Sequence, residues 1–107
     1  MVDIEKLKHE IVERLKPLDP DKIILFGSYA YGTPNEDSDI DLFLVKDIES
    51  SNARMYRLAA RKNLRGLVQK HKIGFDVLAA SNDFLKQRED YFYKVDILSK
   101  GKVLYAK

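Results

Sequence analysis

The sequence GSYAYGTPNEDSDIDLFLV, residues 27–45, joins a Gly-Ser pair through a polar loop to a strand that begins with acids. Successive side chains of a strand point to opposite faces, so Asp39 and Asp41 are expected on one face of a strand over residues 38–45. The intervening positions are apolar and would share the other face: Ile40, Leu42 and Leu44. Carboxylates at the mouth of a buried strand repel each other unless a cation lies between them, so this stretch predicts a cation site.

A third acid interrupts another apolar stretch, IGFDVLA, in which Asp76 points away from its apolar neighbours. A helix over residues 50–72 would connect the two strands, and a crossover of that length allows them to lie near each other. Asp39, Asp41 and Asp76 would then form a three-carboxylate site. Hard oxygen ligands without His or Cys favour Mg²⁺ or Mn²⁺ over zinc. The simpler interpretation is that Asp39 and Asp41 lie on a solvated strand face and that Asp76 caps a turn.

Gly27 and Ser28 follow a short apolar strand, residues 22–26, and precede a helical turn over residues 29–31. A glycine lets the backbone approach a ligand closely, and the amides that open a helix bind anions, to which the Ser28 hydroxyl adds a donor. An ordinary turn with Ser28 as the helix N-cap predicts the same local geometry. What favours a phosphate site is its pairing with a carboxylate cluster through a loop of ten residues.

The remaining apolar periodicities predict a small mixed α/β sheet with helices packed on it, in the order αβ(α)βαβα(β). The N-terminal helix, residues 3–16, should end before Pro17 because Lys16 is pushed out of the helical region, and its apolar stripe is Ile4, Leu7, Ile11, Leu15 and Leu18. The long helix should bury Tyr56, Ala60, Leu64, Leu67 and Val68. A third strand, residues 73–79, precedes a helix that starts at residues 81–83 and runs, with a break, to Ser99. Tyr91, Phe92 and Tyr93 should pack this last helix, and residues 102–106 should form an edge strand.

The composition fits one compact domain, residues 1–107. With 107 residues, 45% of them apolar, the chain is long enough for one core and too short for two. There are 19 basic and 17 acidic residues, so the net charge of +2 does not indicate a general polyanion binder. Cysteine is absent, which excludes disulfides and thiolate sites. The longest wholly apolar runs are four residues, far short of a membrane span, and the N-terminus lacks the apolar stretch of a signal peptide, so a cytoplasmic protein is predicted.

The combination of Gly27-Ser28, ten residues, Asp39-x-Asp41 and a later lone aspartate on a strand resembles the DNA polymerase β-like nucleotidyltransferase superfamily, and within it the minimal nucleotidyltransferases. The ending DILSKGKVLY is also similar, so the resemblance covers nearly the whole chain. It implies that Asp39, Asp41 and Asp76 hold two Mg²⁺ ions, with Asp76 also able to take the acceptor's proton, and that Gly27 and Ser28 bind the β and γ phosphates of ATP. Tyr31 is a departure, because the family commonly reads GSYARG where this chain reads GSYAYG. Either activity is weakened or a residue such as Arg54 substitutes for the lost arginine.

The resemblance also implies a reaction and a partner. Minimal nucleotidyltransferases are typically paired with a HEPN-domain toxin and act as its antitoxin by transferring AMP from ATP to one of its tyrosine hydroxyls. One alternative is a catalytically idle module that neutralises the toxin by binding alone. Another is an RNA-binding protein that uses the basic helix 54–72, whose stripe is Arg54, Arg57, Arg61, Arg65 and Lys72. Nucleic acid is the less favoured partner, because charged helix faces are usually just solvated.

Overall fold

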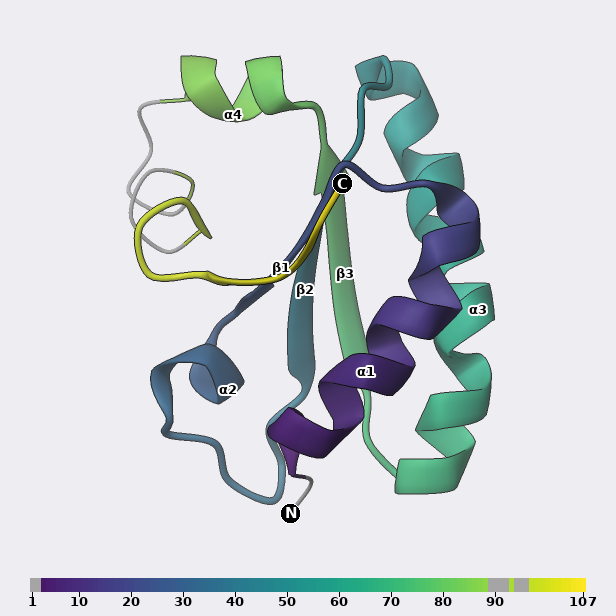
Figure 1. Cartoon of the computed structure of the whole chain (residues 1–107), viewed down its shortest axis with the longest axis vertical. Coiled ribbons are helices and arrows are strands. Elements are labelled where there is room, and N and C mark those ends of the chain that lie inside the picture. Colours follow the sequence, from purple (N-terminus) through teal and green to yellow (C-terminus); the bar gives the residue numbers. More distant parts are fainter. Residues whose placement is uncertain (1–2, 89–92, 94–96) are drawn as a thin grey trace.

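The computed structural model describes residues 3–88, 93 and 97–107, and these contain a four-stranded mixed sheet with helices packed on it (Figure 1). The helices are α1 (Ile4–Leu15), α2 (Ser28–Tyr31), α3 (Ala53–His71) and α4 (Asn82–Gln87), with 3₁₀ turns η1 (Lys16–Leu18) and η2 (Ser50–Asn52). The strands are β1 (Lys22–Phe26), β2 (Ile40–Val45), β3 (Phe75–Ala80) and β4 (Lys102–Ala106). The predicted fold class and element order are confirmed.

The sheet order is β3-β2-β1-β4, so β2 is a central strand. It pairs antiparallel with β1 and parallel with β3, which places Asp41 beside Phe26 on one side and beside Asp76 on the other. Helix α3 carries the chain from the end of β2 back to the start of β3, as parallel neighbours require. Strand β4 pairs antiparallel with β1 at the other edge, which confirms the predicted edge strand.

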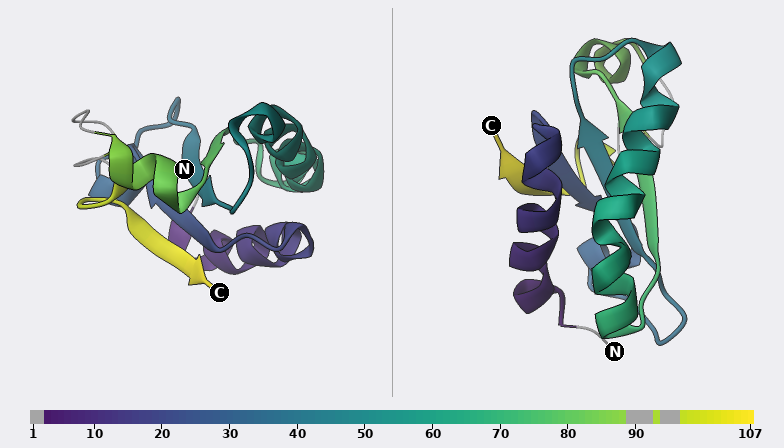
Figure 2. Two further views of the ribbon diagram at one scale, coloured as in Figure 1. Left: turned by 90° about the horizontal axis from the view of Figure 1, so that it is seen from above. Right: turned by 90° about the vertical axis from the view of Figure 1, so that its right-hand side faces the viewer.

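Helices α1 and α3 cover one face of the sheet, as the two views of Figure 2 show. The core on this face includes Leu7, Ile11 and Leu15 of α1, Ile40, Leu42 and Leu44 of β2, and Ala60, Leu64 and Leu67 of α3, each at most 1% exposed. The predicted buried face of the long helix is right at Ala60, Leu64 and Leu67. Tyr56 is only half-buried, and Val68 is 37% exposed. None of the described helices combines the length and the apolar composition that crossing a lipid bilayer requires.

A second apolar cluster covers part of the opposite face. It consists of Ile24, Phe26, Phe43, Val45, Leu85 and Ile97, with Leu78, Ala80 and Tyr93 packed against it. The Tyr93 ring meets Phe43 and Phe84 edge-on, with centroids 6.1 and 5.5 Å apart. Tyr91 and Phe92, and most of the predicted continuation to Ser99, lie outside the described residues. On β2 and β3 this cluster begins two residues beyond Asp41 and Asp76, whereas on β1 it reaches Phe26, which pairs with Asp41.

The chain departs from prediction at Pro17. Lys16 keeps helical angles, φ −52° and ψ −39°, and the chain continues through η1 before it reverses at Asp19, which has φ +52°. Proline needs no amide partner in the first turn of a helix, so the 3₁₀ turn accommodates it. The α-helix ends at Leu15, before Pro17, as expected, but the reason expected for this end is wrong, because Lys16 does not leave the helical region.

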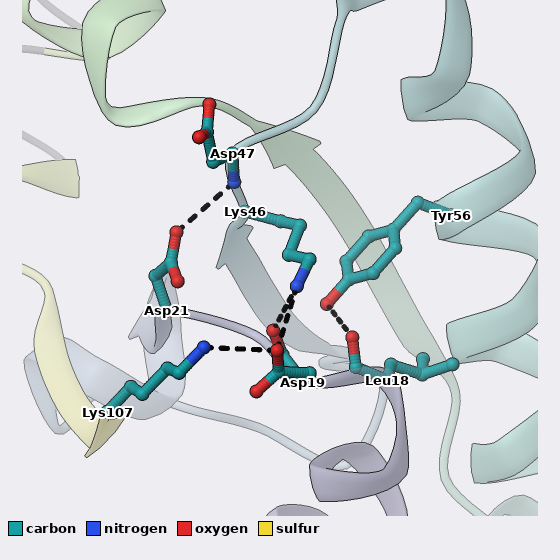
Figure 3. Close-up of polar contacts among 7 residues, drawn as sticks. All are labelled: Leu18, Asp19, Asp21, Lys46, Asp47, Tyr56 and Lys107. Atoms are coloured by element: carbon teal, nitrogen blue, oxygen red, sulfur yellow. Dashed lines mark hydrogen bonds and ion pairs between the residues drawn. The ribbon is translucent and has the colours of Figure 1, made fainter.

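An ionic cluster holds together the loop before β1, the end of β2 and the end of β4 (Figure 3). Lys107 and Lys46 contact the Asp19 carboxylate at 3.0 and 3.2 Å, and hydrogen bonds from these two lysines lower the pKa of Asp19. The neighbouring Asp21 carboxylate accepts a hydrogen bond from the Asp47 amide at 3.1 Å. These contacts fix the end of the sheet that lies opposite Asp39 and Asp41.

Tyr56 ties α3 to the same loop. Its hydroxyl donates to the Leu18 carbonyl oxygen at 3.1 Å (Figure 3). Burial, followed by the negative charges of Asp19 and Asp21, raises the pKa of Tyr56 to about 12. The hydroxyl therefore keeps its proton, and this hydrogen bond, well above neutral pH.

Truncation of Leu42 tests whether β2 depends on the face covered by α1 and α3. Leu42 is 0% exposed, so Leu42→Ala should lower the free energy of unfolding by about 2–5 kcal/mol, measured by urea denaturation. The matched control is Leu58→Ala on α3, where the side chain is 44% exposed and the change should be within about 0.5 kcal/mol. Equal losses in the two variants would contradict this packing.

Candidate functional site

Three aspartates lie at the same end of one face of the sheet. Asp39 directly precedes β2, and Asp41 is its second residue. Asp76 is the second residue of β3 and pairs in register with Asp41. Since alternation puts Asp41 on the face of Phe43 and Asp76 on the face of Leu78, both carboxylates share the face that bears the second cluster. The structure therefore brings together the three residues that the sequence singled out, from two neighbouring strands.

Their electrostatics agree with this placement. Asp41 is half-buried between its neighbours, whereas Asp39 and Asp76 are exposed. Burial, followed by the negative charges of Asp76 and then Asp39, raises the pKa of Asp41 to about 6. Two like charges that act on one carboxyl are the electrostatic result expected when three carboxylates gather. Within the described part of the chain, none of the three carboxylates forms a hydrogen bond or an ion pair with a basic side chain.

Gly27 forms one wall of this cluster. Its φ of +73° and ψ of −160° suit glycine, and a Cβ atom at this position would collide with the Asp41 carboxylate. Gly27 is also the N-cap of α2, and Ser28 is the first residue of the helix, with no side-chain capping bond. The interpretation of Ser28 as an N-cap is therefore wrong. The strand–Gly–Ser–helix turn instead places Ser28 one residue from the backbone that touches Asp41.

Gly74 is a site residue that the sequence reasoning missed. A Cβ atom there would lie 2.6 Å from Asp39 Oδ1, so a side chain at this position would require the exposed Asp39 carboxylate to rotate away. The Gly74 carbonyl oxygen also accepts a hydrogen bond from the Ile40 amide at 2.9 Å, which joins the entrances of β2 and β3. The available sequence signal was its place two residues before Asp76, as glycines in strands often mark close approach.

The described residues hold no group of three or more acidic, histidine or cysteine side chains already arranged around one point as a metal site. The three aspartates do supply the hard oxygen donors that Mg²⁺ prefers, and repulsion at Asp41 would be relieved by a cation. Metal binding by Asp39, Asp41 and Asp76 thus stays a prediction. It would draw the carboxylates inward from the positions seen.

The basic stripe of α3 lies elsewhere. Arg54, Arg61, Arg65 and Lys72 are exposed and Arg57 is half-buried, on a helix that packs against the face of the sheet opposite the acids. Arg54 follows the end of β2, whereas Asp39 and Asp41 stand at its start. The structure therefore does not bring Arg54 to the acids, and its proposed role as a substitute for the arginine missing at position 31 has no support.

A pocket of about 250 Å³ lies toward the ends of β2 and β3, where residues 48–50 after β2 and residues 79–81 at the end of β3 contribute to its lining. Phe43, Leu78, Phe84 and Tyr93 form its apolar lining, and Arg57 reaches it from α3. Phe43 and Leu78, which follow Asp41 and Asp76 by two residues, form the side of the pocket nearest the acids, and the rest of the pocket extends away from them. An apolar or aromatic side chain of a ligand could be held there.

Comparisons with known proteins agree with this geometry. The family model for the nucleotidyltransferase domain matches residues 4–104. A protein of Methanocaldococcus jannaschii, named as a candidate protein adenylyltransferase, is 29% identical over 102 residues that cover 95% of this chain and 90% of that protein.

Two solved toxin–antitoxin structures have a similar fold. One was determined with AMP-PNP. Its matched chain is 22% identical to this one, with a TM-score of 0.59, and the match covers 94% of this chain and 73% of the matched chain. The other contains a tri-AMPylated HEPN toxin of Shewanella oneidensis in complex with MNT antitoxin. Its matched chain is 19% identical to this one, with a TM-score of 0.55, and the match covers 98% of this chain and 74% of the matched chain. At these identities the two structures support the fold alone.

The raised pKa of Asp41 makes the stability of the metal-free protein depend on pH. The folded state holds the Asp41 proton more tightly than the unfolded state, so this stabilisation is complete below about pH 3.8 and is lost as the pH rises through about 6. Asp41→Asn removes the repulsion, so its advantage over the parent protein should grow from near zero at pH 4 to about 1–2 kcal/mol at pH 7, allowing for partial exposure. Denaturant titrations at both pH values measure this.

The matched control is Asp37→Asn, in the loop that leads to the same strand, where Asp37 is exposed. Because this side chain is exposed, the substitution should change the free energy of unfolding by no more than about 0.5 kcal/mol. A stability difference for Asp41→Asn that was flat between pH 4 and pH 7 would refute the clustering of the three carboxylates.

Proposed function

The chain belongs to the nucleotidyltransferase domain family, and from this premise we propose that it transfers AMP from ATP to a tyrosine hydroxyl of a partner HEPN-domain toxin. Residues 1–107 would act as one catalytic domain in the cytoplasm, where ATP is available. The observation that carries the proposal is the gathering of Asp39, Asp41 and Asp76 at one end of one sheet face, with Asp41 against the Gly27 turn.

Gly27 and Ser28 would bind the β and γ phosphates of ATP. The Ser28 hydroxyl makes no capping bond, and the backbone at Gly27 is in contact with the Asp41 carboxylate, so phosphates at this turn would lie next to the acids. This arrangement would leave the α-phosphorus facing Asp41 and Asp76. An acceptor oxygen that arrived from the pocket side would then stand opposite the departing pyrophosphate, as in-line displacement requires.

Asp76 is the proposed general base. It is exposed and carries no cationic partner among the described residues. In the proposed reaction, Asp76 takes the tyrosine hydroxyl proton while the oxygen forms a bond to the α-phosphorus. The bond from the α-phosphorus to the bridging oxygen breaks, and pyrophosphate leaves with that electron pair. The products are tyrosine-linked AMP and pyrophosphate.

Asp39, Asp41 and Asp76 would hold two Mg²⁺ ions, with Mn²⁺ as a substitute. Ions at this site supply charge stabilisation for the acceptor oxygen and for the departing pyrophosphate. The charges of Asp76 and Asp39 both act on Asp41, so Asp41 would gain most from the arrival of cations.

The partner is proposed from the relatives and from the pocket. The two solved structures pair proteins of this fold with toxins, and one of those toxins carries AMP. In this chain, an apolar pocket lined by Phe43, Phe84 and Tyr93 lies further along β2 and β3 from the acids and could hold an apolar side chain of the partner protein. A protein acceptor therefore suits the surface better than a small polar molecule does.

The RNA-binding alternative has less support. Single-stranded RNA is usually bound by basic residues together with aromatic rings on which bases stack. Residues 53–71, all of which are described, include Tyr56 and His71 as ring-bearing side chains. Both are half-buried; Tyr56 donates to Leu18, and His71 Nε2 lies 2.9 Å from Glu10. The basic stripe thus lacks a stacking platform, and RNA binding stays a prediction from the sequence.

AMP transfer can be tested with labelled ATP. The protein is incubated with its cognate HEPN-domain toxin, Mg²⁺, and ATP labelled on either the α or the γ phosphate. Label from the α position alone should appear on the toxin, since AMP is the transferred group. Asp39→Asn should reduce the rate about a hundredfold or more, because it removes a charged ligand from the site of charge development. Label from the γ position alone would mean that the protein is a kinase.

The control for Asp39→Asn is Asp37→Asn, which changes an exposed acid two residues upstream and should retain the parent rate. Mapping the modified residue by mass spectrometry separates a tyrosine from serine or threonine acceptors. AMP found on the protein itself, with none on the toxin, would contradict the proposed direction of transfer.

Neutralisation by binding alone can be distinguished from catalysis by the growth of cells that express the toxin. If catalysis is required, Asp39→Asn should fail to rescue growth when the toxin is expressed, although a pull-down still recovers the complex. Rescue equal to that of the parent protein would identify an idle module that neutralises its partner by contact. Asp37→Asn serves again as the variant that should rescue fully.

A further inference from the structure

The charge balance of the proposed site calls for a cation from the protein. Three carboxylates and a fully ionised triphosphate carry more negative charge than two divalent ions neutralise. Asp39, Asp41 and Asp76 have no basic partner among the described residues, and the basic stripe of α3 packs on the opposite face. A basic side chain near Ser28 would therefore strengthen the binding of a nucleotide's phosphates, and the structure offers one from the C-terminal part of the chain.

Strand register brings Lys100 to the Gly-Ser turn. Leu25 of β1 pairs with Lys102 of β4, and the two strands run antiparallel. Lys100 stands two residues before Lys102, and Gly27 two residues after Leu25, so the continuations of the two strands face each other. The opposite flank of β1 at this level is Asp41, which pairs with Phe26. Lys100 and Asp41 thus flank the end of β1 from its two sides.

The chain before β4 also lies over the correct face of the sheet. A Cβ atom on Gly101 would come within 2.6 Å of Ile24 Cγ2. Ile24 belongs to the second apolar cluster with Phe43, on the face that carries Asp41. Residue 101 therefore packs onto the face that bears the acids, and Lys100 precedes it directly.

The Lys100 side chain contacts Tyr31, which belongs to the same helical turn as Ser28. Lys100 Nζ lies 5.8 Å from the centroid of the Tyr31 ring, within the range of cation–π contacts. Tyr31 follows Ser28 by three residues in α2, so the two side chains lie on the same side of this helical turn. The ring carries no formal charge, and Lys100 forms no ion pair with a described acid, so no described carboxylate competes with a ligand for its donors.

From these contacts we infer that Lys100 is a phosphate-binding residue, which contacts the β or γ phosphate of the nucleotide from the β4 side while Tyr31 positions it. The inference rests on the proposed function, since it adds a residue to the same site. The Tyr31 ring and Lys100 together provide a cation next to Ser28 from a distant part of the chain. Lys100 takes no part in bond formation at the α-phosphorus.

The test compares nucleotides that differ in their phosphates. Affinities for AMP and for an ATP analogue with a methylene group between the α and β phosphorus atoms are measured by calorimetry with Mg²⁺ present, using the full chain. Lys100→Ala should weaken binding of the ATP analogue about tenfold and leave AMP affinity unchanged within about twofold. Lys100→Arg should restore most of the loss. Lys86→Ala removes an exposed lysine of α4 and should change neither affinity.

Substitutions at Tyr31 test the positioning role. Tyr31→Phe keeps the ring and should bind the ATP analogue as the parent protein does, whereas Tyr31→Leu should weaken it in the same direction as Lys100→Ala. Circular dichroism and thermal unfolding confirm that each variant is folded, as expected at exposed positions.

Two failures are distinguishable. If the parent protein binds neither nucleotide and transfers no AMP, the proposed function fails and the inference falls with it. If the parent protein binds the ATP analogue but Lys100→Ala binds it equally well, or loses AMP affinity to the same extent, the role of Lys100 is refuted while the proposed function stands.

Discussion

Strand β2 holds ionisable carboxylates against one another, and the rest of the structure depends on how it does so. Its alternation sends Ile40, Leu42 and Leu44 into the core and Asp41 to the opposite face. Each of the three buried side chains contributes about 1.5–3 kcal/mol of favourable burial. That is comparable with the free energy by which repulsion and desolvation oppose ionisation of Asp41. The strand can therefore carry an unfavourable charge at its entrance because its other face is anchored between β1, β3, α1 and α3.

The glycines next to the acids follow from the same constraint. Side chains at Gly27 and Gly74 would occupy the space of the Asp41 and Asp39 carboxylates, respectively. The Gly-Ser motif is thus explained in part without a ligand: the turn after β1 has to pass a carboxylate closely, and glycine at φ +73° permits this. A turn forced against the acids in this way also brings the next residue, Ser28, close to them. Packing and proposed phosphate binding therefore favour the same residues.

Features that depend on local periodicity could be predicted from the sequence. Features that depend on strand register, or on how the chain adjusts locally at a turn, could not. The faces of β2 and the stripe of α1 follow from alternation and from helical spacing, and both are found. Asp76 pairs with Asp41, but this depends on how far α3 carries the chain, which no local pattern specifies. Lys16 stays helical before Pro17 because the chain has an extra 3₁₀ turn to make before it reverses at Asp19. The approach of Lys100 to Tyr31 joins positions 69 residues apart through the β1–β4 register, so neither residue signals it alone.

The balance of charges links the stability of the domain to its ligands. Without a bound cation, the carboxylates oppose one another, and the folded state carries that free energy. A ligand that binds the folded state and neutralises the carboxylates removes this repulsion. The stability it restores adds to the ordinary gain from mass action. A divalent ion and a nucleotide would enter a site whose protein groups are already gathered by β2 and β3, so little of their binding energy is spent on ordering the backbone. The ordering left to do concerns side chains, chiefly the inward rotation of exposed Asp39 and Asp76 and the extension of Lys100, each of which can occur without movement of the core.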